Sequence, residues 1–297
     1  MRFLLLGGSG QLGEELRARA ANCGIDVVAP SRQSLDLDDA SAIAREIAAE
    51  PWSGVMNAAA YTDVDRAESE QAAAFDLNAQ ALSRLAVETA RRRIPLIHIS
   101  TDYVFDGRKG APYVEHDAVA PLNAYGRSKL AGGRRVCEAN PRQVILRTAC
   151  LYSPFWRNFV KTILRLARER DRLTIVADQR GCPTAARDVA RARLEVALRC
   201  ASDPLRVPYG IYHYVGGGET TWFDFARTIV EMANEGSGRS PEIVPIQTAE
   251  YPTPAVRAAD TRLDCTAVVH EFGVEVVPWR RALEDTIGRL LANKDIQ

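Results

Sequence analysis

Three polar side chains, Thr101, Tyr125 and Lys129, have the types and the spacing to transfer a proton to a carbonyl oxygen. Tyr125 and Lys129 stand four residues apart in the segment NAYGRSKLAGG, so on a helix both would lie on one face. A free tyrosine has a pKa of about 10, and a neighbouring ammonium group would lower that pKa by favouring the phenolate. The hydroxyl of Thr101, in the segment STDYVFDG, could orient the carbonyl against the phenol. The alternative is that the Tyr-x-x-x-Lys pair, a common chance pattern, only decorates a helix surface.

A glycine-rich turn follows the first apolar run of the chain. In RFLLLGGSGQLGEEL, Gly7, Gly10 and Gly13 fall three apart between a predicted strand and a predicted helix. One glycine permits the tight turn, the next lets a phosphate approach the backbone, and the third lets helix and strand pack closely. The helix that begins with Gln11 and Leu12 would offer free N–H groups to a pyrophosphate. The turn therefore predicts dinucleotide binding, the alternative being a plain strand–helix connection.

The residues after the second and third predicted strands indicate which dinucleotide binds. Where an acidic residue would grip a ribose 2′-hydroxyl, the chain has Ser31 and Arg32, and an arginine suits a 2′-phosphate. We therefore expect NADP(H) rather than NAD(H), with NADH as a coenzyme that the site could also accept. The alternative for Arg32 is a solvated loop position, and Asp36 and Leu37 are expected to bracket the adenine. Three small residues would let the sugars of the cofactor pass close to the backbone: Ala58, Ala59 and Ala60.

Short apolar runs alternate with helical patterns in the first half of the chain. This alternation predicts right-handed crossovers and a parallel sheet covered on both faces, the doubly wound α/β arrangement of a Rossmann domain. Ligands of such sheets bind beyond the carboxyl ends of the strands, where Thr101 would lie. The predicted strands are 2–6, 26–29, 54–60, 94–100 and 143–148, and the predicted helices between them include 11–23 and 78–93.

The alternation loosens after about residue 150. We predict a dinucleotide-binding domain over residues 1–150 and a smaller α/β substrate-binding lobe over residues 151–297, with a helix near 187–200 that could pack back on the first domain. Prolines predict an irregular segment over residues 242–264. A C-terminal helix from about Pro278 would complete the lobe.

The composition argues against several classes of partner. The chain has 38 Lys and Arg against 38 Asp and Glu, which gives no electrostatic case for nucleic acid or an anionic membrane. Its first apolar stretch is too short for a signal peptide, and no run approaches the roughly 20 apolar residues of a membrane span. Six cysteines without a close pair favour reduced thiols, so we expect a cytoplasmic protein. Four histidines lack metal-ligand spacing, and no metal site is predicted.

Together these motifs resemble the extended short-chain dehydrogenases/reductases, and among them the dTDP-4-dehydrorhamnose reductase family. The glycine turn and the Tyr–Lys segment are general to the superfamily, whereas STDYVFDG, DQRGCPT and YPTPAVRAADTRL are more specific. Matching stretches run nearly end to end. The resemblance implies NADPH-dependent reduction of the C4 carbonyl of dTDP-4-dehydro-L-rhamnose to dTDP-L-rhamnose, a step in the synthesis of cell-surface polysaccharide such as lipopolysaccharide O-antigen.

The resemblance also implies roles for the site residues. Tyr125 would donate the proton to the developing alkoxide, Lys129 would lower the pKa of Tyr125 and hold the nicotinamide ribose, and Thr101 would hydrogen-bond the carbonyl oxygen. Arg257 and the segment DQRGCPT would cover the nucleotide part of the substrate. By match to the substrate contacts of the family, the sugar site would also include Val64, Asp102, Tyr103 and Cys150.

The sequence departs from the family pattern in places. Cys150 stands where the family has a tryptophan that packs against the sugar, which opens the site, and Trp156 is the candidate to fill the gap. Gly133 replaces a glutamate, and Ala258 replaces a proline. Some members bind magnesium at a dimer contact formed by acidic side chains, so the resemblance allows a Mg²⁺ ion and a homodimer, although no ligands for the ion can be placed.

Two other functions are weighed against the reductase. A related extended member could act on another nucleotide sugar as a reductase or an epimerase, but epimerases retain NAD and would prefer an acid after the second strand. A dehydratase would need a glutamate where Tyr103 follows Asp102. A non-catalytic regulatory subunit that binds NADP would not need Thr101, Tyr125 and Lys129 together.

Overall fold

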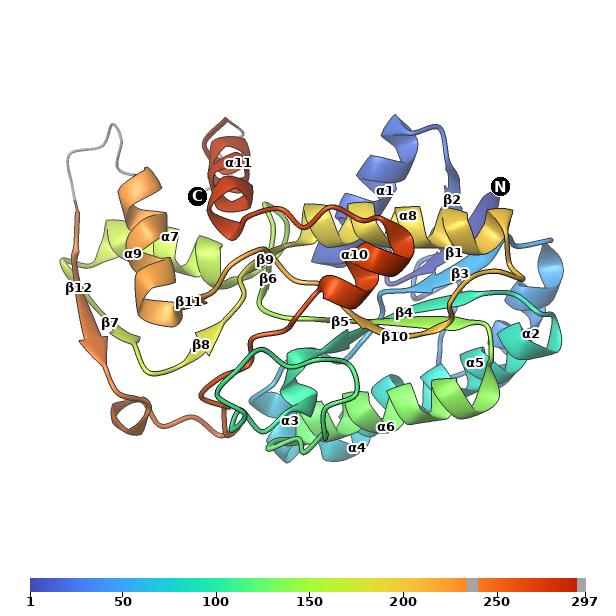
Figure 1. Cartoon of the computed structure of the whole chain (residues 1–297), viewed down its shortest axis with the longest axis horizontal. Helices are drawn as coiled ribbons and strands as arrows, with labels where there is room; N and C mark the ends of the chain where they lie inside the picture. Colours follow the sequence, from blue (N-terminus) through green and yellow to red (C-terminus); the bar gives the residue numbers. More distant parts are fainter. Residues whose placement is uncertain (234–239, 293–297) are drawn as a thin grey trace.

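A six-stranded parallel sheet forms the centre of the protein (Figure 1). The computed structural model describes residues 1–233 and 240–292. The spatial order of the strands is β10-β5-β4-β3-β1-β2, and it reverses between β1 and β3, where the carboxyl ends leave a crevice for ligands. The strands are β1 (Arg2–Leu6), β2 (Asp26–Val28), β3 (Gly54–Asn57), β4 (Leu96–Thr101), β5 (Gln143–Thr148) and β10 (Gly210–His213).

Helices cover both faces of this sheet, which confirms the predicted doubly wound α/β fold (Figure 1). Helices α1 and α8 pack side by side on one face, and α2, α5 and α6 cover the other. Because β3, β4 and β5 are buried on both faces, their residues form nearly continuous apolar runs. The helices of this part are α1 (Gln11–Asn22), α2 (Ala40–Ala49), α3 (Arg66–Ser69), α4 (Gln71–Phe75), the π-helix η1 (Asp76–Ala81), α5 (Leu82–Arg91), the 3₁₀ turn η2 (Asp102–Val104), α6 (Ala124–Ala139), α8 (Ala186–Ser202) and α10 (Thr266–Phe272).

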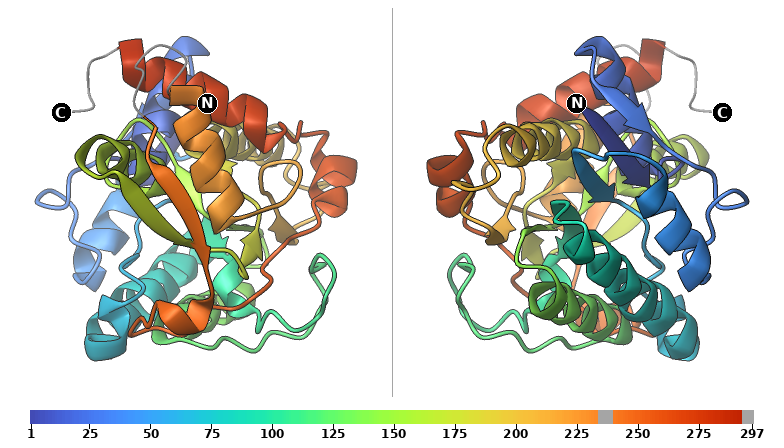
Figure 2. Two further views of the ribbon diagram at one scale, coloured as in Figure 1. Left: turned by 90° about the vertical axis from the view of Figure 1, so that its left-hand side faces the viewer. Right: turned by 90° about the vertical axis from the view of Figure 1, so that its right-hand side faces the viewer.

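The second half of the chain contributes to the sheet and also builds a separate apolar core. Strand β10 pairs with β5, and α8 packs against α1. A second cluster of buried residues joins α7, α9 and α11, at the end of the molecule that faces the viewer on the left of Figure 2. The division into two domains near residue 150 stays a prediction, and residues 234–239 and 293–297 of the predicted lobe lie outside the described residues.

Short strands and helices make up this second region. Strand β7 pairs in parallel with β12, β8 pairs antiparallel with β11, and β6 pairs in parallel with β9. The bounds are β6 (Leu151–Tyr152), α7 (Phe159–Glu169), β7 (Arg172–Val176), β8 (Arg180–Gly181), β9 (Thr184–Ala185), β11 (Thr220–Thr221), α9 (Trp222–Ala233), β12 (Glu242–Ile246), the 3₁₀ turn η3 (Thr248–Glu250) and α11 (Trp279–Ala292).

Strand β12 contradicts the predicted irregular segment over residues 242–246. Its five residues pair with β7, and Pro245 sits opposite Ile175. A proline can be accepted there because β12 pairs with β7 alone, so the position without an N–H can face away from its partner. The proline therefore marked an edge strand.

Helix α6, which carries Tyr125 and Lys129, rests directly on the π-helix η1. A Cβ atom on Gly132 would lie 1.9 Å from the carbonyl oxygen of Asn78, so only glycine fits at this contact. The side chain of Asn78 also donates to Ser128 Oγ at 2.9 Å. Close packing and this hydrogen bond fix the position of α6 relative to the carboxyl edge of the sheet.

Candidate active site

A large cleft opens at the carboxyl edge of the sheet and reaches from the glycine turn to Tyr125 and Lys129. Its volume is about 1020 Å³. The turn after β1, the ends of β2, β3 and β4, and helix α6 all contribute to its walls. Among the residues predicted to hold a cofactor, those that line it are Gly7, Gly10, Gln11, Leu12, Gly13, Arg32, Asp36, Leu37, Ala58, Ala59, Ala60, Tyr125 and Lys129. Ser31 is the exception, because its exposed hydroxyl pairs with Ser34.

The glycine turn brings three segments of backbone into contact. Gly7 has a φ of 76°, and a Cβ there would lie 2.5 Å from the amide nitrogen of Ala59. A Cβ on Gly13 would lie 2.2 Å from the carbonyl oxygen of Gly7, whereas one on Gly10 would meet that oxygen only at 3.6 Å. Gly10 caps α1 without a side chain. The first N–H groups of the helix are therefore open to an anion, and the turn fits a dinucleotide phosphate.

Trp156 lies over the glycine turn. Its indole Nε1–H donates to the carbonyl oxygen of Ser9, and the residue is 61% exposed. Trp156 and the neighbouring Arg157 line the large cleft beside the residues of the turn. Trp156 lines the large cleft together with Cys150, whereas Trp222 lines the smaller cavity, so the filling of the space beside Cys150 by Trp156 stays a prediction.

Thr101 and Tyr125 come to the same part of the cleft from β4 and α6. Thr101 is the last residue of β4, and Tyr125 lies in the first turn of α6. The side chain of Asn123 caps that helix by accepting from the Gly126 N–H at 2.8 Å. A Cβ on Gly126 would lie 2.2 Å from the carbonyl oxygen of Tyr103, so the helix start presses against the segment that follows β4.

Lys129 is held in a buried polar network beneath the cleft. It is 1% exposed, and its Nζ donates to the carbonyl oxygen of Ile99 at 2.7 Å. Its Nζ also lies 3.2 Å from His98 Nε2. On the other side of the ring, His98 Nδ1 lies 3.2 Å from the side-chain nitrogen Nδ2 of Asn57. Since Asn57 Oδ1 accepts from the Ala59 N–H, its amide N–H₂ faces His98 Nδ1 and places the imidazole proton on Nε2. With this tautomer, the neutral amine of Lys129 can accept from His98 Nε2–H, whereas its ammonium form cannot.

The charges of the network agree with this assignment. Burial and, to a smaller extent, the guanidinium of Arg193 lower the pKa of Lys129 to about 7. Burial, together with the charges of Lys129 and Arg193, holds the pKa of His98 well below its ordinary value. Arg193 is itself fully buried on α8 and donates to the carbonyl oxygens of Asn57 and Ile97 at 3.1 and 2.9 Å. Its Nε and Nη1 have no hydrogen-bond partner among the described residues.

The pKa of Tyr125 is raised, and not lowered as the sequence led us to expect. Burial raises it most, the hydrogen bond with Thr101 offsets part of the rise, and the charge of Asp102 adds to it. The predicted direction is wrong because Lys129 turns its amine toward Ile99 and His98 and is itself close to neutral. A raised pKa keeps Tyr125 protonated at neutral pH, which is the form that can donate a proton.

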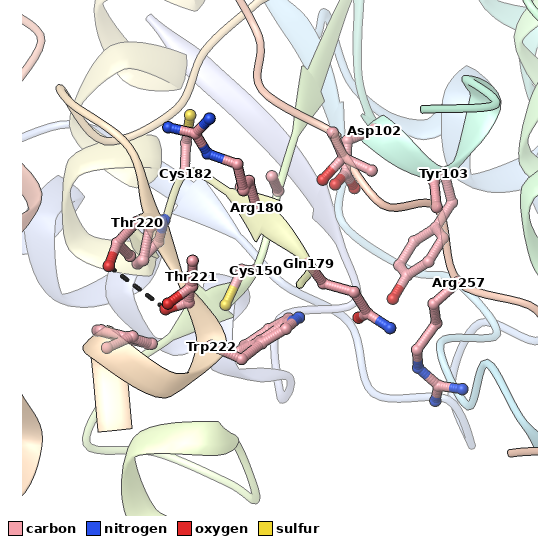
Figure 3. Close-up of a pocket in the computed structure, with 16 residues that line it drawn as sticks. Asp102, Tyr103, Cys150, Gln179, Arg180, Cys182, Thr220, Thr221, Trp222 and Arg257 are labelled. Carbon is pink, nitrogen blue, oxygen red and sulfur yellow. Dashed lines mark hydrogen bonds between the residues drawn. The ribbon is translucent and has the colours of Figure 1, made fainter. Parts of the chain in front are cut away.

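Asp102 is a buried carboxyl group at the junction of two cavities. It is 5% exposed and lines both the large cleft and a smaller cavity of about 80 Å³ (Figure 3). Its pKa is raised to about 6, because burial outweighs the opposite effect of hydrogen bonds, the largest of which is with Thr261, followed by that with Thr101. Tyr103 and Cys150 also line both cavities, whereas Val64 lines only the large cleft. Cys150 has a φ of 41°, an uncommon conformation for a residue with a Cβ.

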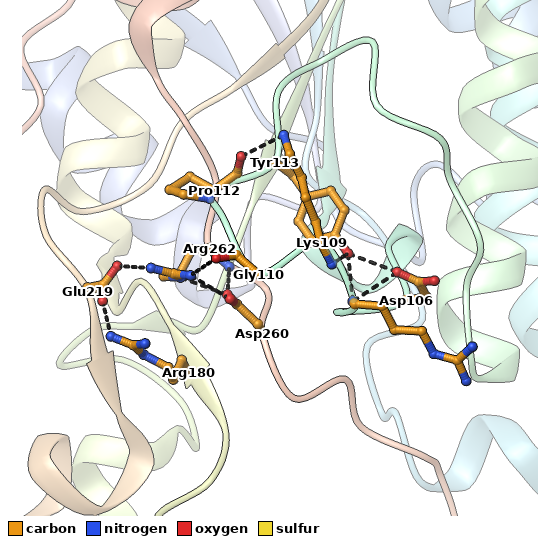
Figure 4. A network of polar contacts seen from close by, with 10 residues as sticks. Asp106, Lys109, Gly110, Pro112, Tyr113, Arg180, Glu219, Asp260 and Arg262 are labelled. Atoms are coloured by element: carbon orange, nitrogen blue, oxygen red, sulfur yellow. Dashed lines mark hydrogen bonds and ion pairs between the residues drawn. The ribbon is translucent and has the colours of Figure 1, made fainter.

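Arg257 lines the smaller cavity next to Tyr103 (Figure 3). Its two terminal nitrogens donate to the two carboxylate oxygens of Asp65 at 2.9 and 2.8 Å. Arg180 lines the same cavity and pairs with Glu219, which also binds Arg262, and Arg262 binds Asp260 in turn (Figure 4). These ion pairs tie the segment after β12 to β8 and to the loop that precedes β11.

The sequence analysis did not identify His98 and Arg193 as residues of the site. His98 and Arg193 lie within a strand and a helix that the hydrophobic pattern describes as ordinary packing, and the only sequence signal was a polar residue inside a buried run. Within residues 1–233 and 240–292, no group of three or more His, Cys, Asp or Glu could hold a metal ion. Over the same ranges no helix is both long and apolar enough to span a membrane.

Comparison with known proteins gives consistent matches over the whole chain. Residues 1–292 match the family described as "RmlD substrate binding domain". The dTDP-4-dehydrorhamnose reductase of Sinorhizobium fredii is 40% identical over 291 residues, which cover 98% of this chain and 98% of that protein. The solved dTDP-4-dehydrorhamnose reductase of Clostridium acetobutylicum has a TM-score of 0.90 at 33% identity and covers 98% of this chain and 100% of its own. That of Bacillus anthracis, solved in complex with NADP, has a TM-score of 0.89 at 31% identity and covers 97% and 99%.

Proposed function

This chain belongs to the RmlD substrate binding domain family, and on that premise we propose that it reduces the C4 carbonyl of dTDP-4-dehydro-L-rhamnose to dTDP-L-rhamnose with NADPH. One structural observation supports the proposal independently of the matches to named proteins. A single cleft joins the glycine turn at one end to Thr101, Tyr125 and Lys129 at the other. A dinucleotide and a ketone could therefore meet beside a proton donor.

The residues of the cleft fit an NADP(H) molecule. The close backbone approaches at Gly7 and Gly13 leave the start of α1 open to the diphosphate, and Arg32 at the end of β2 suits the 2′-phosphate. Lys129 would hold the nicotinamide ribose. When bound, NADPH supplies the hydride that the carbonyl carbon receives.

Two hydroxyl groups act on the oxygen of the substrate carbonyl. Tyr125 remains protonated at neutral pH because burial raises its pKa, and it gives its proton to the oxygen as negative charge develops there. Thr101 orients the same oxygen by a hydrogen bond. Val64, Asp102, Tyr103 and Cys150 would line the sugar, and Arg257 stays a proposed contact of the nucleotide part.

The test is turnover by the purified protein. With dTDP-4-dehydro-L-rhamnose, NADPH absorbance should fall in proportion to the dTDP-L-rhamnose formed, and product should be identified by chromatography. Other dTDP- and UDP-4-keto sugars complete the panel. Reduction of a different sugar alone would move the substrate assignment. A protein that retains NAD through purification would indicate an epimerase, and one that binds NADP without turnover of any sugar would indicate a regulatory subunit.

Arg32→Gln should weaken the preference for NADPH. The arginine lines the cleft at the end of β2 and is exposed, so its loss removes a cation from the 2′-phosphate and leaves the fold unchanged. We expect KM for NADPH to rise about tenfold, since hydrogen bonds to charged groups contribute about 1.5–3 kcal/mol, with KM for NADH nearly constant. Arg92→Gln, an exposed arginine at the end of α5, is the matched control. Equal changes for both coenzymes would exclude a role at the 2′-phosphate.

The same proposal includes the cellular compartment and the oligomeric state of the enzyme. We place it in the cytoplasm, because its six cysteines are all free thiols and the proposed coenzyme is a cytoplasmic reductant. A homodimer is proposed from the family resemblance alone, and light scattering of the purified protein would measure its mass.

A further inference from the structure

The hydroxyl of Thr101 has a single proton, and the structure commits that proton to Asp102. Thr101 Oγ1 donates to Asp102 Oδ1 at 3.0 Å and accepts from the Tyr103 N–H at 3.2 Å. A hydroxyl group has one donor and two acceptor positions. While Asp102 is a carboxylate it can only accept, so Thr101 has no proton left for a carbonyl oxygen in the cleft.

Burial is the factor that favours a neutral carboxyl group at Asp102. The residue is buried at the end of β4 between two cavities, and this effect exceeds the opposite effect of its hydrogen bonds with Thr261, from the segment after β12, with Thr101 and with the backbone N–H groups of Asp102 and Tyr103. The two arginines that line the smaller cavity are paired with other carboxylates, Arg257 with Asp65 and Arg180 with Glu219. The other ionisable groups that face this region are Tyr103 on η2, Tyr125 and Lys129 on α6, Cys150 after β5 and Cys182 before β9.

These neighbours do not supply a fixed positive charge at the carboxyl group. The phenols and thiols have raised pKa values and are neutral, and burial lowers the pKa of Lys129 to about 7. The pKa of Asp102 is raised to about 6, with burial as the main cause, so the carboxyl group is protonated in slightly acidic solution and largely ionised at pH 7 in the free protein. A sugar that fills the cavities would exclude water and raise this pKa further.

We propose that Asp102 is a positioning residue that acts as a protonated carboxylic acid, whose O–H donates to Thr101 Oγ1 and so directs the Thr101 hydroxyl proton to the carbonyl oxygen of the substrate. The inference rests on the proposed reductase function. Protonation of Asp102 changes only the direction of its hydrogen bond with Thr101. Asp102 and Thr101 each keep their proton through the reaction, and the proton that ends on the product oxygen comes from Tyr125.

The direction of the pH dependence follows from this assignment. Below the pKa of Asp102 the hydroxyl of Thr101 is available, and above it the charged carboxylate takes that hydroxyl back. The value of kcat/KM should therefore fall as pH rises through the pKa, by up to tenfold for each pH unit. Lys129 titrates in the same range, so the profile needs a variant that separates the two groups.

Asp102→Asn separates them, because its amide N–H₂ donates to Thr101 Oγ1 at every pH. We expect kcat/KM of this variant to be lower than that of the wild type at acid pH by less than tenfold, and to lose the falling limb at higher pH. Asp102→Ala supplies no donor and should lose about 100-fold in kcat/KM at all pH values. Binding of NADPH, measured by fluorescence, should be unchanged in both variants and shows that they are folded.

Two kinetic outcomes would overturn the inference. One is that Asp102→Asn keeps the falling limb at the wild-type pH, because Lys129 or Tyr125 would then carry it. The other is that Asp102→Asn is as inactive as Asp102→Ala while it still binds NADPH, because a charged carboxylate would then be required.

A carbon-13 NMR titration of the Asp102 carboxyl, assigned by its loss in Asp102→Asn, needs no turnover. An ordinary aspartate pKa overturns the inference even in an active enzyme, and a pKa near 6 supports it. If the wild type binds NADPH and reduces no 4-keto sugar, the proposed function fails, and the titration alone then decides the protonation state of Asp102.

Discussion

Tyr125→Phe should lower kcat for NADPH-dependent reduction about 1,000-fold, because a general acid contributes typically 10²–10⁴-fold to the rate. The phenol lies at the start of α6 within hydrogen-bond reach of Thr101, and Ser128, the other hydroxyl on that helix, donates to the carbonyl oxygen of Tyr125. Phenylalanine keeps the ring and its edge contact with Tyr103. The change therefore removes a proton donor and leaves the packing.

The measurement is kcat with saturating sugar, beside the dissociation constant for NADPH. The dissociation constant should change by less than about threefold. Tyr209→Phe is the matched control, since its hydroxyl donates to the carbonyl oxygen of Pro204 and it lines neither cavity. Full activity of Tyr125→Phe would mean that another group protonates the alkoxide, and the assignment of Tyr125 would have to be given up.

Alanine at two glycines of the same turn should weaken NADPH binding in both cases but lower stability in only one. In Gly13→Ala the new Cβ would lie 2.2 Å from the carbonyl oxygen of Gly7 and 2.6 Å from the carbonyl carbon of Gly8. Both contacts are with backbone, which cannot turn aside, so α1 must move away from β1. Overpacking of this kind costs about 1–3 kcal/mol or more, and we expect a clear fall in melting temperature together with loss of NADPH binding.

Gly10→Ala adds its Cβ at 3.6 Å from the nearest atom, which is ordinary contact. Its melting temperature should stay close to that of the wild type. The methyl group stands at the wall of the cleft where the diphosphate would approach, so the dissociation constant for NADPH should rise at least about tenfold, as expected when a phosphate loses close approach to the backbone.

Gly288→Ala, in α11, gives the baseline for both variants. No atom lies within 4 Å of its new Cβ, and alanine favours a helix, so stability should be equal or slightly higher. If Gly13→Ala matched this baseline in stability, the close packing of the turn would be refuted. If Gly10→Ala bound NADPH with wild-type affinity, the diphosphate would have to lie elsewhere.

The parts of the site that the sequence predicted are those encoded by short segments. The spacing of Gly7, Gly10 and Gly13 determines a turn, and Tyr125 and Lys129 share one helix face, so neither needs a distant partner. The parallel sheet followed from alternating patterns in the first half of the chain. Its sixth strand, β10, could not be assigned to the sheet in the same way, because it is separated from β5 by residues that build the second apolar core.

The electrostatics of the site depended on contacts that no local pattern contains. Arg193 is 136 residues from Asn57 in the sequence. Its buried guanidinium group lies on α8, on the opposite face of the sheet from α6, and it helps to lower the pKa of Lys129. A Tyr-x-x-x-Lys motif alone predicted a charged lysine that acidifies the phenol. Only the fold shows that the amine points toward His98 and Ile99 and that burial dominates the pKa of both groups.

The lowered pKa of Lys129 has a consequence for chemical modification, because part of its amine is uncharged at neutral pH. An uncharged amine is a nucleophile, whereas the exposed lysines of a protein are protonated at pH 7 and react slowly. Lys129 lines the cleft, so a small aldehyde that enters the cleft would meet this amine. Such a reagent should form an imine at Lys129 ahead of Lys109 and Lys161, and NADP⁺ should protect the residue, so that the extent of labelling reports coenzyme occupancy.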